Sequence, residues 1–402
     1  MNDSSAGSEN DAFKLLNLLY HFEIALEASP RIDEIGFIHP SQLPVVDSGS
    51  ENRQFWIGDG KLGVSTEIVF PLFEAAKDAF FAALRSENRS DELILKHSKS
   101  VLLMNSDFST AWNTRKMIIC KKQELSTLVK ELDLSAAVLS HSHKSDQSWC
   151  HRRWVLKMIA SNGAMPPEIV EKESELVEKM AERSKMNYRA WNHRCWLVSY
   201  MSKEQVENEM RKGKSWASLH VADNSSFHYR HVLNFSFFSF PFLQCSSWQR
   251  LLSVYINKFQ GENPSNIIRV PFSVLNLWII LPVLQEELEW NEQLIKRYVG
   301  REALWLHRRV VWLIGVKFCK MIDNDLLLRK ELDFVKCCMT INDTEFEDYE
   351  AQAFHSASYL AWLIKNGIKL SNEHVMNLKA MDLQVSLQQK APERYSLWNR
   401  IL

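Results

Sequence analysis

The sequence predicts an all-α protein built as a solenoid of stacked helical hairpins, and three observations lead to this prediction. A phrase of the form W-x-x-R recurs along the 402 residues. Apolar residues ahead of these phrases follow the three- and four-residue spacing of an amphipathic helix. Strand signals are few, and the chain has only 12 glycines. Repeated helix pairs bury their apolar faces against neighbouring pairs, so the expected architecture is a repeat array.

The recurring phrase consists of an aromatic residue followed by an arginine three positions later. The clearest copies are SWCHRRWVLK at 148–157, NYRAWNHRCWLV at 187–198 and REALWLHRRVVWL at 301–313, while FSTAWNTRK at 108–116 and SSFHYRHVL at 225–233 are more divergent. The intervals between the aromatics are 37, 42, 36 and 78 residues, so one copy has diverged or been replaced. The aligned pairs are Trp112 and Arg115, Trp149 and Arg152, Trp191 and Arg194, Phe227 and Arg230, and Trp305 and Arg308.

Residues three and four apart lie on one face of a helix, so each arginine shares a face with its aromatic residue. We expect the aromatic to fill the seam between neighbouring hairpins and the arginine to enter the same seam. A buried guanidinium needs partners, and the expected ones are carboxylates or free carbonyls at helix ends. The histidines of the phrases, His151, His193 and His307, are expected to form hydrogen bonds in the seam rather than to act as catalysts.

Each hairpin is completed by a helix that precedes the phrase. Ahead of Trp191, Pro166 and Pro167 mark a helix start, because proline suits the first turn. The stretch FEDYEAQAFHSASYLAWLIKN at 346–366 predicts a helix whose apolar and small-residue face caps the open end of the array. Ahead of Trp149, a helical stripe is formed by Leu125, Leu128, Val129, Leu132, Ala136 and Leu139.

Six segments are expected along the chain. Between the fourth and fifth phrases lies a stretch rich in phenylalanine and serine and interrupted by prolines, which is either a partner-binding insert or a segment translated from an unspliced or misassigned exon. The segments are a disordered lead (1–10), an N-terminal helical region (11–99), a first block of repeats (100–233), the atypical insert (234–283), a further repeat (284–320) and a C-terminal helical cap (321–402).

Composition argues against several functional classes. The 48 basic and 49 acidic residues give a formal net charge of -1, so no overall field favours nucleic acid. The seven cysteines include no C-x-x-C pair, which argues against a disulfide framework and a zinc ribbon. His141 and His143 are expected to be a solvated helix end rather than a metal site. The N-terminal residues lack a secretory pattern and the most apolar window, 270–284, is too short to span a membrane, so we expect a cytoplasmic protein.

The phrase W-x-H-R-[RC]-x-W, preceded by N-Y-x-x or its variants, resembles the repeat of protein prenyltransferase α subunits. The resemblance covers about residues 100–233 and 284–318. The stretches PRIDEIGFI (30–38), KLGV (61–64) and LLMNSDFSTAWNTRK (102–116) resemble one branch of that family. Members are crescent-shaped, right-handed α-α superhelices that wrap a catalytic β subunit, so the resemblance implies both that fold and that partner.

The resemblance also implies a chemistry. In that family a zinc-bound cysteine thiolate of the target protein attacks C1 of a prenyl diphosphate, and the zinc ligands and most of the lipid pocket belong to the β subunit. It therefore implies no cofactor in this chain and zinc in a β subunit, for which the Rab geranylgeranyltransferase type is a candidate. The implied substrates at the shared site are geranylgeranyl or farnesyl diphosphate and cysteine-terminated proteins such as small GTPases or SNARE-like proteins.

Three residues correspond by position to those with which such α subunits reach the shared active site. Lys144, five residues before Trp149, takes the place of a lysine that reaches the diphosphate, and Tyr188, three before Trp191, takes the place of an active-site tyrosine. Arg189 stands where farnesyltransferase-type subunits have histidine, and a guanidinium is able to clamp a diphosphate or a carboxylate. Without the resemblance, Lys144 would be an ordinary exposed lysine and Tyr188 a packing residue with a wet hydroxyl.

Two hypotheses for the function stay open on the sequence. The first is the accessory, non-catalytic α subunit of a heterodimeric protein prenyltransferase, which is not active alone. The second is a helical-repeat scaffold that binds other proteins without catalysis, and the departure at Arg189 and the missing repeat copy keep it open. A nucleic-acid tract formed by the arginines is disfavoured, because the seam places their side chains inside.

Overall fold

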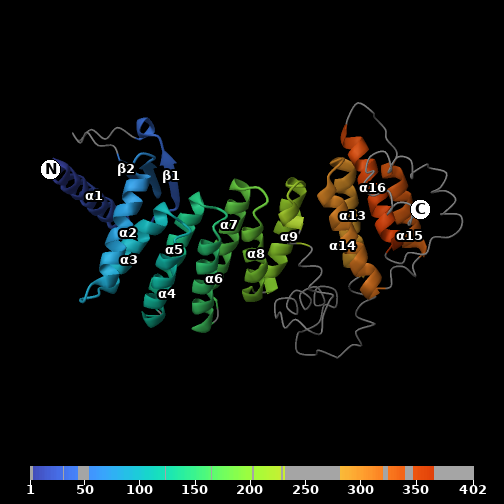
Figure 1. Ribbon diagram of the computed structural model, residues 1–402. Helices are drawn as coiled ribbons and strands as arrows, with labels where there is room; N and C mark the ends of the chain where they lie inside the picture. The colour runs from blue at the N-terminus through green and yellow to red at the C-terminus, as the bar shows by residue number, and fades with distance from the viewer. Residues whose placement is uncertain are drawn as a thin grey trace. The chain divides into compact units, whose positions relative to one another are not determined.

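Helices predominate in the part of the chain that the structure describes, and the all-α repeat fold is confirmed (Figure 1). The computed structural model describes residues 3–29, 31–43, 54–122, 124–163, 165–201, 203–227, 230, 281–319, 325–339 and 347–365. The chain divides into two compact units, Met1–Arg194 and Cys195–Leu402. None of the described helices is long and apolar enough to cross a membrane. The expected insert lies outside the described residues as far as position 280.

The first unit consists mainly of helices that pack against their neighbours along the chain. Ser90 and Ser145 begin two of these helices, because each side-chain oxygen accepts a hydrogen bond from a backbone N–H of the first turn. Pro167 begins another, as the sequence predicts. The helices are α1 (Asp3–Ala28), α2 (Val69–Arg85), α3 (Asp91–Met104), α4 (Ser109–Lys122), α5 (Leu125–His141), α6 (Asp146–Ser161), α7 (Pro167–Arg183) and α8 (Tyr188–Leu197).

α1 begins at Asp3, within the residues 1–10 for which a disordered lead is expected from the sequence. Leu18, Leu19 and Phe22 on this helix are buried in the core of the first unit. Once such an anchored helix has formed, each further residue adds a hydrogen bond without a new nucleation step. Extension towards the N-terminus follows from that anchoring rather than from the polar composition of the first ten residues.

The region expected as an N-terminal helical region, residues 11–99, contains helices and also a small three-stranded sheet in the order β1-β3-β2. Its strands are β1 (Glu34–Ile38), β2 (Phe55–Gly58) and β3 (Lys61–Ser65). β1 runs parallel to β3, and β2 runs antiparallel to it. Asp59 and Gly60 join β2 to β3 with φ angles of 49° and 71°, which suit a two-residue hairpin turn. The dipeptide Asp-Gly between short apolar strands is the sequence signal for this hairpin.

The sheet is fixed to the ends of two repeat helices. The backbone N–H of Ile35 in β1 donates to the Ser140 hydroxyl near the end of α5, at 2.9 Å. Glu34 in the same strand forms an ion pair of 2.8 Å with Arg183, the last residue of α7. The sheet therefore holds the C-terminal ends of α5 and α7, from which the loops of the candidate site continue.

Buried glutamates join successive hairpins of the first unit. The Arg152 guanidinium on α6 donates to both carboxylate oxygens of Glu173 on α7, at 2.7 Å from Nε and 2.5 Å from Nη2. Its Nη1 donates to the Leu132 carbonyl at 2.5 Å and to the Ser135 hydroxyl at 2.9 Å, both on α5. His193 Nε2 on α8 lies 3.0 Å from the same carboxylate of Glu173. We call this arrangement of arginine, glutamate and histidine a clasp.

The same clasp occurs one hairpin earlier. Arg115 on α4 donates to both oxygens of Glu131 on α5, and His151 Nε2 on α6 lies 3.0 Å from that carboxylate. Arg115 Nη1 donates to the Leu95 carbonyl at 2.6 Å and to the Ser98 hydroxyl at 2.8 Å. Of the two kinds of partner expected for the arginines, the structure shows carboxylates, and the accepting carbonyl in both clasps lies inside a helix rather than at a helix end. A carbonyl oxygen has two lone pairs and serves both the helix and the guanidinium.

Tryptophan rings pack beside the clasps. Trp112 and Trp149 are fully buried, and each ring lies against the histidine of the following hairpin, with centroid distances of 4.4 Å to His151 and 4.9 Å to His193. The Trp149 Nε1 donates to the backbone carbonyl of His143 at 3.0 Å. The tryptophan of the phrase therefore packs against the next hairpin, and its ring N–H binds the loop that immediately precedes its own helix.

The second unit has its own clasps. Glu287 on α13 accepts hydrogen bonds from Arg230 and lies 3.0 Å from His307 Nε2 on α14. The described elements are η2 (Val198–Tyr200), α9 (Lys203–Leu219), α13 (Leu281–Arg297), α14 (Glu302–Cys319), α15 (Asp325–Met339) and α16 (Glu347–Lys365). The helix predicted at 346–366 corresponds to α16, and it buries Leu360 and Leu363.

The last clasp replaces histidine with tyrosine. Arg308 on α14 donates to both oxygens of Glu331 on α15 at 2.6 Å, and its Nη1 donates to the Leu288 carbonyl at 3.1 Å. The hydroxyl of Tyr359 on α16 donates to Glu331 at 2.7 Å. The helix that was expected to cap the array thus takes part in the same pattern of contacts as the repeats.

The buried clasps make the stability of the fold depend on pH. Burial disfavours the ionised form of Glu131 and Glu173, but the adjacent arginine and histidine outweigh burial and lower the pKa of each carboxyl to about 2. Burial lowers the pKa of His151 and His193 below the ordinary value of 6.5. The hydrogen bond from each histidine to its glutamate raises the pKa, but by less than burial lowers it. Such histidines take up protons more readily in the unfolded chain, so stability falls as the pH drops below about 6.5.

We therefore expect the free energy of unfolding to fall as the pH drops from about 7.5 through about 6.5, and to fall further below about pH 4.5, where the glutamates of the unfolded chain bind protons. Each buried histidine contributes a slope of up to about 1.4 kcal/mol per pH unit. Urea unfolding at pH 7.5, 5.5 and 4 measures this dependence. His193→Gln, which keeps an amide near Glu173 but does not titrate, should lose less between the first two conditions. Equal urea midpoints for the unsubstituted chain at pH 7.5 and 5.5 would contradict the expectation.

Candidate functional site

The three residues expected at a shared active site lie at two neighbouring loops. Lys144 belongs to the loop between α5 and α6, and Tyr188 and Arg189 begin α8 after the loop that follows α7. The side-chain amide of Asn187 donates to the backbone carbonyl of His143 at 2.9 Å. His143 belongs to the first loop and Asn187 to the second, so this hydrogen bond joins the two loops.

Lys144 is exposed and reaches from one loop to the other. Its ammonium group donates to the backbone carbonyl of Lys185 at 3.1 Å. Across the described residues, no ion pair within 4 Å involves Lys144. An ammonium group has three N–H donors, and one hydrogen bond leaves the others available to an anion.

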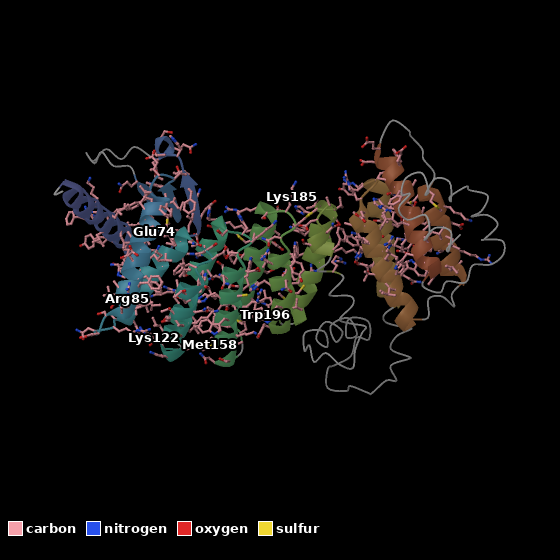
Figure 2. All side chains as sticks on the ribbon, viewed as in Figure 1. Glu74, Arg85, Lys122, Met158, Lys185 and Trp196 are labelled. Carbon is pink, nitrogen blue, oxygen red and sulfur yellow. The ribbon has the colours of Figure 1, made fainter. Side chains whose placement is uncertain are left out.

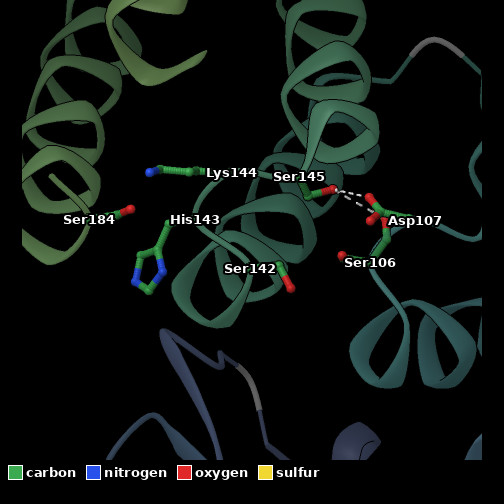
Figure 3. A pocket seen from close by; sticks show the side chains of 7 residues that line it. All are labelled: Ser106, Asp107, Ser142, His143, Lys144, Ser145 and Ser184. Carbon is green, nitrogen blue, oxygen red and sulfur yellow. Dashed lines mark hydrogen bonds between the residues drawn. The ribbon is translucent and has the colours of Figure 1, made fainter. Parts of the chain in front are cut away.

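Lys144 also lines an open hollow of about 410 Å³, shown in Figure 3. The lysine extends from its loop towards Ser184, while Ser145 donates a hydrogen bond of 2.8 Å to Asp107 on the other side. Polar side chains predominate, and the lining residues are Ser106, Asp107, Ser142, His143, Lys144, Ser145 and Ser184. Tyr188 and Arg189 are outside this lining, so the hollow brings together only one of the three expected residues with other polar groups.

Arg189 is oriented by an acidic residue at the start of α6. Its Nη2 lies 2.7 Å from Asp146 Oδ2, and its Nε donates to Asp146 Oδ1. The hydrogen bond from Arg189 lowers the pKa of Asp146, and the same contact raises the pKa of Arg189. The pair leaves the Nη1 group of the guanidinium able to donate to a second anion.

Tyr188 presents its ring to solvent. The side chain is 53 % exposed, and its backbone N–H donates to the Met186 carbonyl at 2.9 Å. Met186 has a φ angle of 54°, which turns the chain sharply into α8. An exposure of this size fits a packing residue with a wet hydroxyl as well as an aromatic ring that a partner contacts.

The two histidines next to Lys144 do not add positive charge at neutral pH. Burial lowers the pKa of His141, and burial together with Arg183 lowers the pKa of His143. No cluster of three or more His, Cys, Asp or Glu side chains suited to a metal ion occurs in the part of the chain that the structure describes. Lys144, Lys185 and Arg189 are therefore the cationic side chains that these two loops and the start of α8 present.

The sequence analysis expected carboxylate partners in the seam without identifying them, and it did not predict an acidic partner for Arg189 at the site. Asp146 follows directly after a serine cap, where acidic residues are common, so its pairing with Arg189 has no local signal. The clasp glutamates do have one, because a glutamate stands 20 residues before the histidine of three phrases. The pairs with this interval are Glu131 and His151, Glu173 and His193, and Glu287 and His307.

The protein prenyltransferase alpha subunit repeat matches residues 128–159, 170–201 and 284–314. Each matched range contains one clasp glutamate and the histidine 20 residues after it. The recurring features of this family model therefore coincide with the residues that join the hairpins.

Similarity to named proteins extends over most of the chain. It is 30% identical over 333 residues to Protein prenyltransferase alpha subunit repeat-containing protein 1 of Homo sapiens, covering 76% of this chain and 79% of that protein. It is 31% identical over 314 residues to Protein prenyltransferase alpha subunit repeat-containing protein 1-B of Xenopus laevis, covering 72% of this chain and 69% of that protein. It is 29% identical over 169 residues to Geranylgeranyl transferase type-2 subunit alpha of Homo sapiens, covering 40% of this chain and 28% of that protein. The clasps, the matched repeats and the extent of this similarity show that the chain belongs to the family of protein prenyltransferase alpha subunit repeat-containing proteins.

Proposed function

We propose that this protein is the α subunit of a heterodimeric protein prenyltransferase and scaffolds a catalytic β subunit. The observation that carries the proposal is the similarity over 169 residues to a protein named as the alpha subunit of geranylgeranyl transferase type-2. In the proposed complex, the β subunit holds zinc and the lipid pocket and transfers a geranylgeranyl or farnesyl group to C-terminal cysteines of cytoplasmic proteins.

The loops before α6 and α8 supply groups with suitable chemistry for the shared site. During transfer, the thiolate sulfur of the acceptor cysteine, already deprotonated, bonds to C1 of the prenyl group, the C1–O bond breaks, and diphosphate departs with the electron pair. Lys144 has N–H groups to donate to the growing charge on the departing oxygens, which is the kind of stabilisation that lowers such a barrier. Arg189, oriented by Asp146, has its Nη1 group for the same anion or for a substrate carboxylate, and Tyr188 presents a ring and a hydroxyl.

The clasps support the scaffolding part of the proposal. They fix the orientation of successive hairpins through buried bidentate hydrogen bonds, which have defined geometry. A rigid repeat array presents a defined surface to a large partner without needing to reorganise on binding. The loops that carry Lys144 and Arg189 are held by the same framework, through the Trp149 and Asn187 hydrogen bonds.

One observation favours the second candidate function, a repeat scaffold without a role in catalysis. Arg189 is already paired with Asp146, so part of its capacity to bind a substrate anion is satisfied within the chain. In that case Lys144 and Arg189 would contribute only to the recognition of a partner. The two functions differ in whether a β subunit joined to this chain transfers a prenyl group.

Co-expression with prenyltransferase β subunits tests whether this chain binds and scaffolds a β subunit. We expect the tagged full chain to retain one β subunit, with the geranylgeranyltransferase type-2 form the first to try, in a one-to-one complex through affinity purification and gel filtration. The matched control is the same β subunit expressed without this chain. Elution of this chain alone with every β subunit tried would contradict the proposed function.

A further inference from the structure

A second cavity, of about 640 Å³, lies in the first unit among residues of α1, α3, α4 and α5. Its walls include the side chains of Leu26, Leu103, Leu134 and Ala137, all of which are buried in the folded chain. Little of these four side chains is exposed to water, so an apolar ligand gains free energy from them mainly by close contact inside the cavity. The cavity lies along α5 from Thr127 onwards, whereas Lys144 lies beyond the other end of that helix.

The same cavity has an excess of positive charge. Six basic and three acidic side chains line it. Two of the acids already have partners inside the protein, because Glu131 binds Arg115 and His151, and Glu27 forms an ion pair of 2.9 Å with Lys96. These two carboxylates are therefore not available to the remaining lysines of the lining.

Three lysines of the lining are without an ion pair within 4 Å among the described residues: Lys99, Lys122 and Lys130. Lys122 ends α4, as Figure 2 shows, and Lys130 lies in the second turn of α5. Both are exposed. Lys99 comes from α3, so the three lysines of the lining that have no ion pair among the described residues come from three different helices.

Lys99 is the most unusual of the three. Its side chain is half-buried, and its ammonium lies 3.5 Å from the Leu26 carbonyl, a long distance for a hydrogen bond. Burial, and then the neighbouring Arg115, lower the pKa of Lys99. A partly desolvated cation beside a second cation is stabilised by an anion placed against it.

We propose that this cavity binds a small organic anion with an aliphatic body, of the alkyl phosphate class. The anionic group would lie among the ammonium groups of Lys99, Lys122 and Lys130, and the hydrocarbon part would cover the walls formed by Leu103 and Leu134. This site is distinct from the proposed active-site loops, and it does not depend on prenyl transfer.

Isothermal titration calorimetry of the full chain with monooctyl phosphate, below its critical micelle concentration, tests the proposal. We expect saturable one-to-one binding that is at least tenfold tighter than binding of inorganic phosphate or of octanol. Inorganic phosphate lacks the aliphatic body and octanol lacks the charge. Equal affinity for inorganic phosphate would overturn the apolar part of the proposal, equal affinity for octanol would overturn the ionic part, and absence of saturable binding would overturn both.

Substitutions in the lining test whether monooctyl phosphate binds in this cavity. Lys99→Gln is expected to weaken monooctyl phosphate binding at least tenfold, and Lys130→Glu, at an exposed position that leaves the fold undisturbed, at least fivefold. Thr127→Trp, which fills the opening, is expected to abolish binding with an unchanged circular dichroism spectrum. The matched control Lys157→Gln, an exposed lysine on α6 outside the lining, should bind as the unsubstituted chain does. Unchanged affinity in both Lys130→Glu and Thr127→Trp would contradict the assignment to this cavity.

Discussion

Arg152→Ala is expected to lower the free energy of unfolding by about 3–5 kcal/mol, because it leaves the buried Glu173 carboxylate without its cation. The side chains of Arg152 and Glu173 are 5% and 1% exposed, so water cannot replace the guanidinium. The Leu132 carbonyl and Ser135 hydroxyl lose their donor at the same time. Urea unfolding followed by circular dichroism measures the loss.

Two further variants distinguish the cost of leaving a buried carboxylate unpaired from the cost of removing an arginine in general. Arg189→Ala removes an exposed pair whose side chains are 41% and 62% exposed, so its expected cost is below about 1 kcal/mol. Arg152→Met with Glu173→Leu removes both charges and should cost less than Arg152→Met alone, since no buried charge is left unpaired. A loss below about 1 kcal/mol for Arg152→Ala would contradict the assignment of the clasp as the contact that holds α6 to α7.

Lys144→Ala is expected to lower prenyl transfer by a complex with a β subunit at least about tenfold while the complex stays intact. The ammonium group is exposed, and the structure gives it a single hydrogen bond, to the Lys185 carbonyl. Its removal therefore costs little stability. If diphosphate departs next to this loop, removal of the cation raises the barrier for transfer. Turnover of labelled geranylgeranyl diphosphate, with gel filtration of the complex in parallel, measures both quantities.

The matched control for Lys144→Ala is Lys172→Ala, an exposed lysine on α7 that does not line the hollow. It should leave turnover and complex formation unchanged. Lys144→Arg keeps a cation at the position and should retain more activity than Lys144→Ala. Turnover of Lys144→Ala equal to that of the unsubstituted complex would remove Lys144 from the active site and favour the scaffold without catalysis.

The repeat architecture could be predicted from the sequence because it is encoded at fixed offsets. Trp149 and Arg152 recur as a pair in other phrases, and the helical spacing of those residues places them on one face. The structure buries Trp149, and it joins Arg152 to Glu173 on the next helix. Prolines at the start of α7 mark that helix in the same local manner.

Features that depend on contacts between distant segments were harder to predict. The glutamate partners of the arginines lie at different distances along the chain, 16 residues for Arg115 and 21 for Arg152, so the arginine phrase alone does not identify them. The pairing of β1 with β3 joins strands that have β2 between them in the sequence, and a short parallel strand has little local signal. The Arg189 contact with Asp146, 43 residues away, is likewise a product of the hairpin packing.

Transfer of labelled geranylgeranyl or farnesyl groups to a cysteine-terminated protein by the purified complex of this chain and a β subunit tests the proposed function most directly. We predict transfer by the complex, little transfer by either chain alone, and loss of transfer when the acceptor cysteine is replaced by serine. A stable complex that transfers neither group to any cysteine-terminated small GTPase or SNARE-like protein tried would contradict a role as a prenyltransferase subunit.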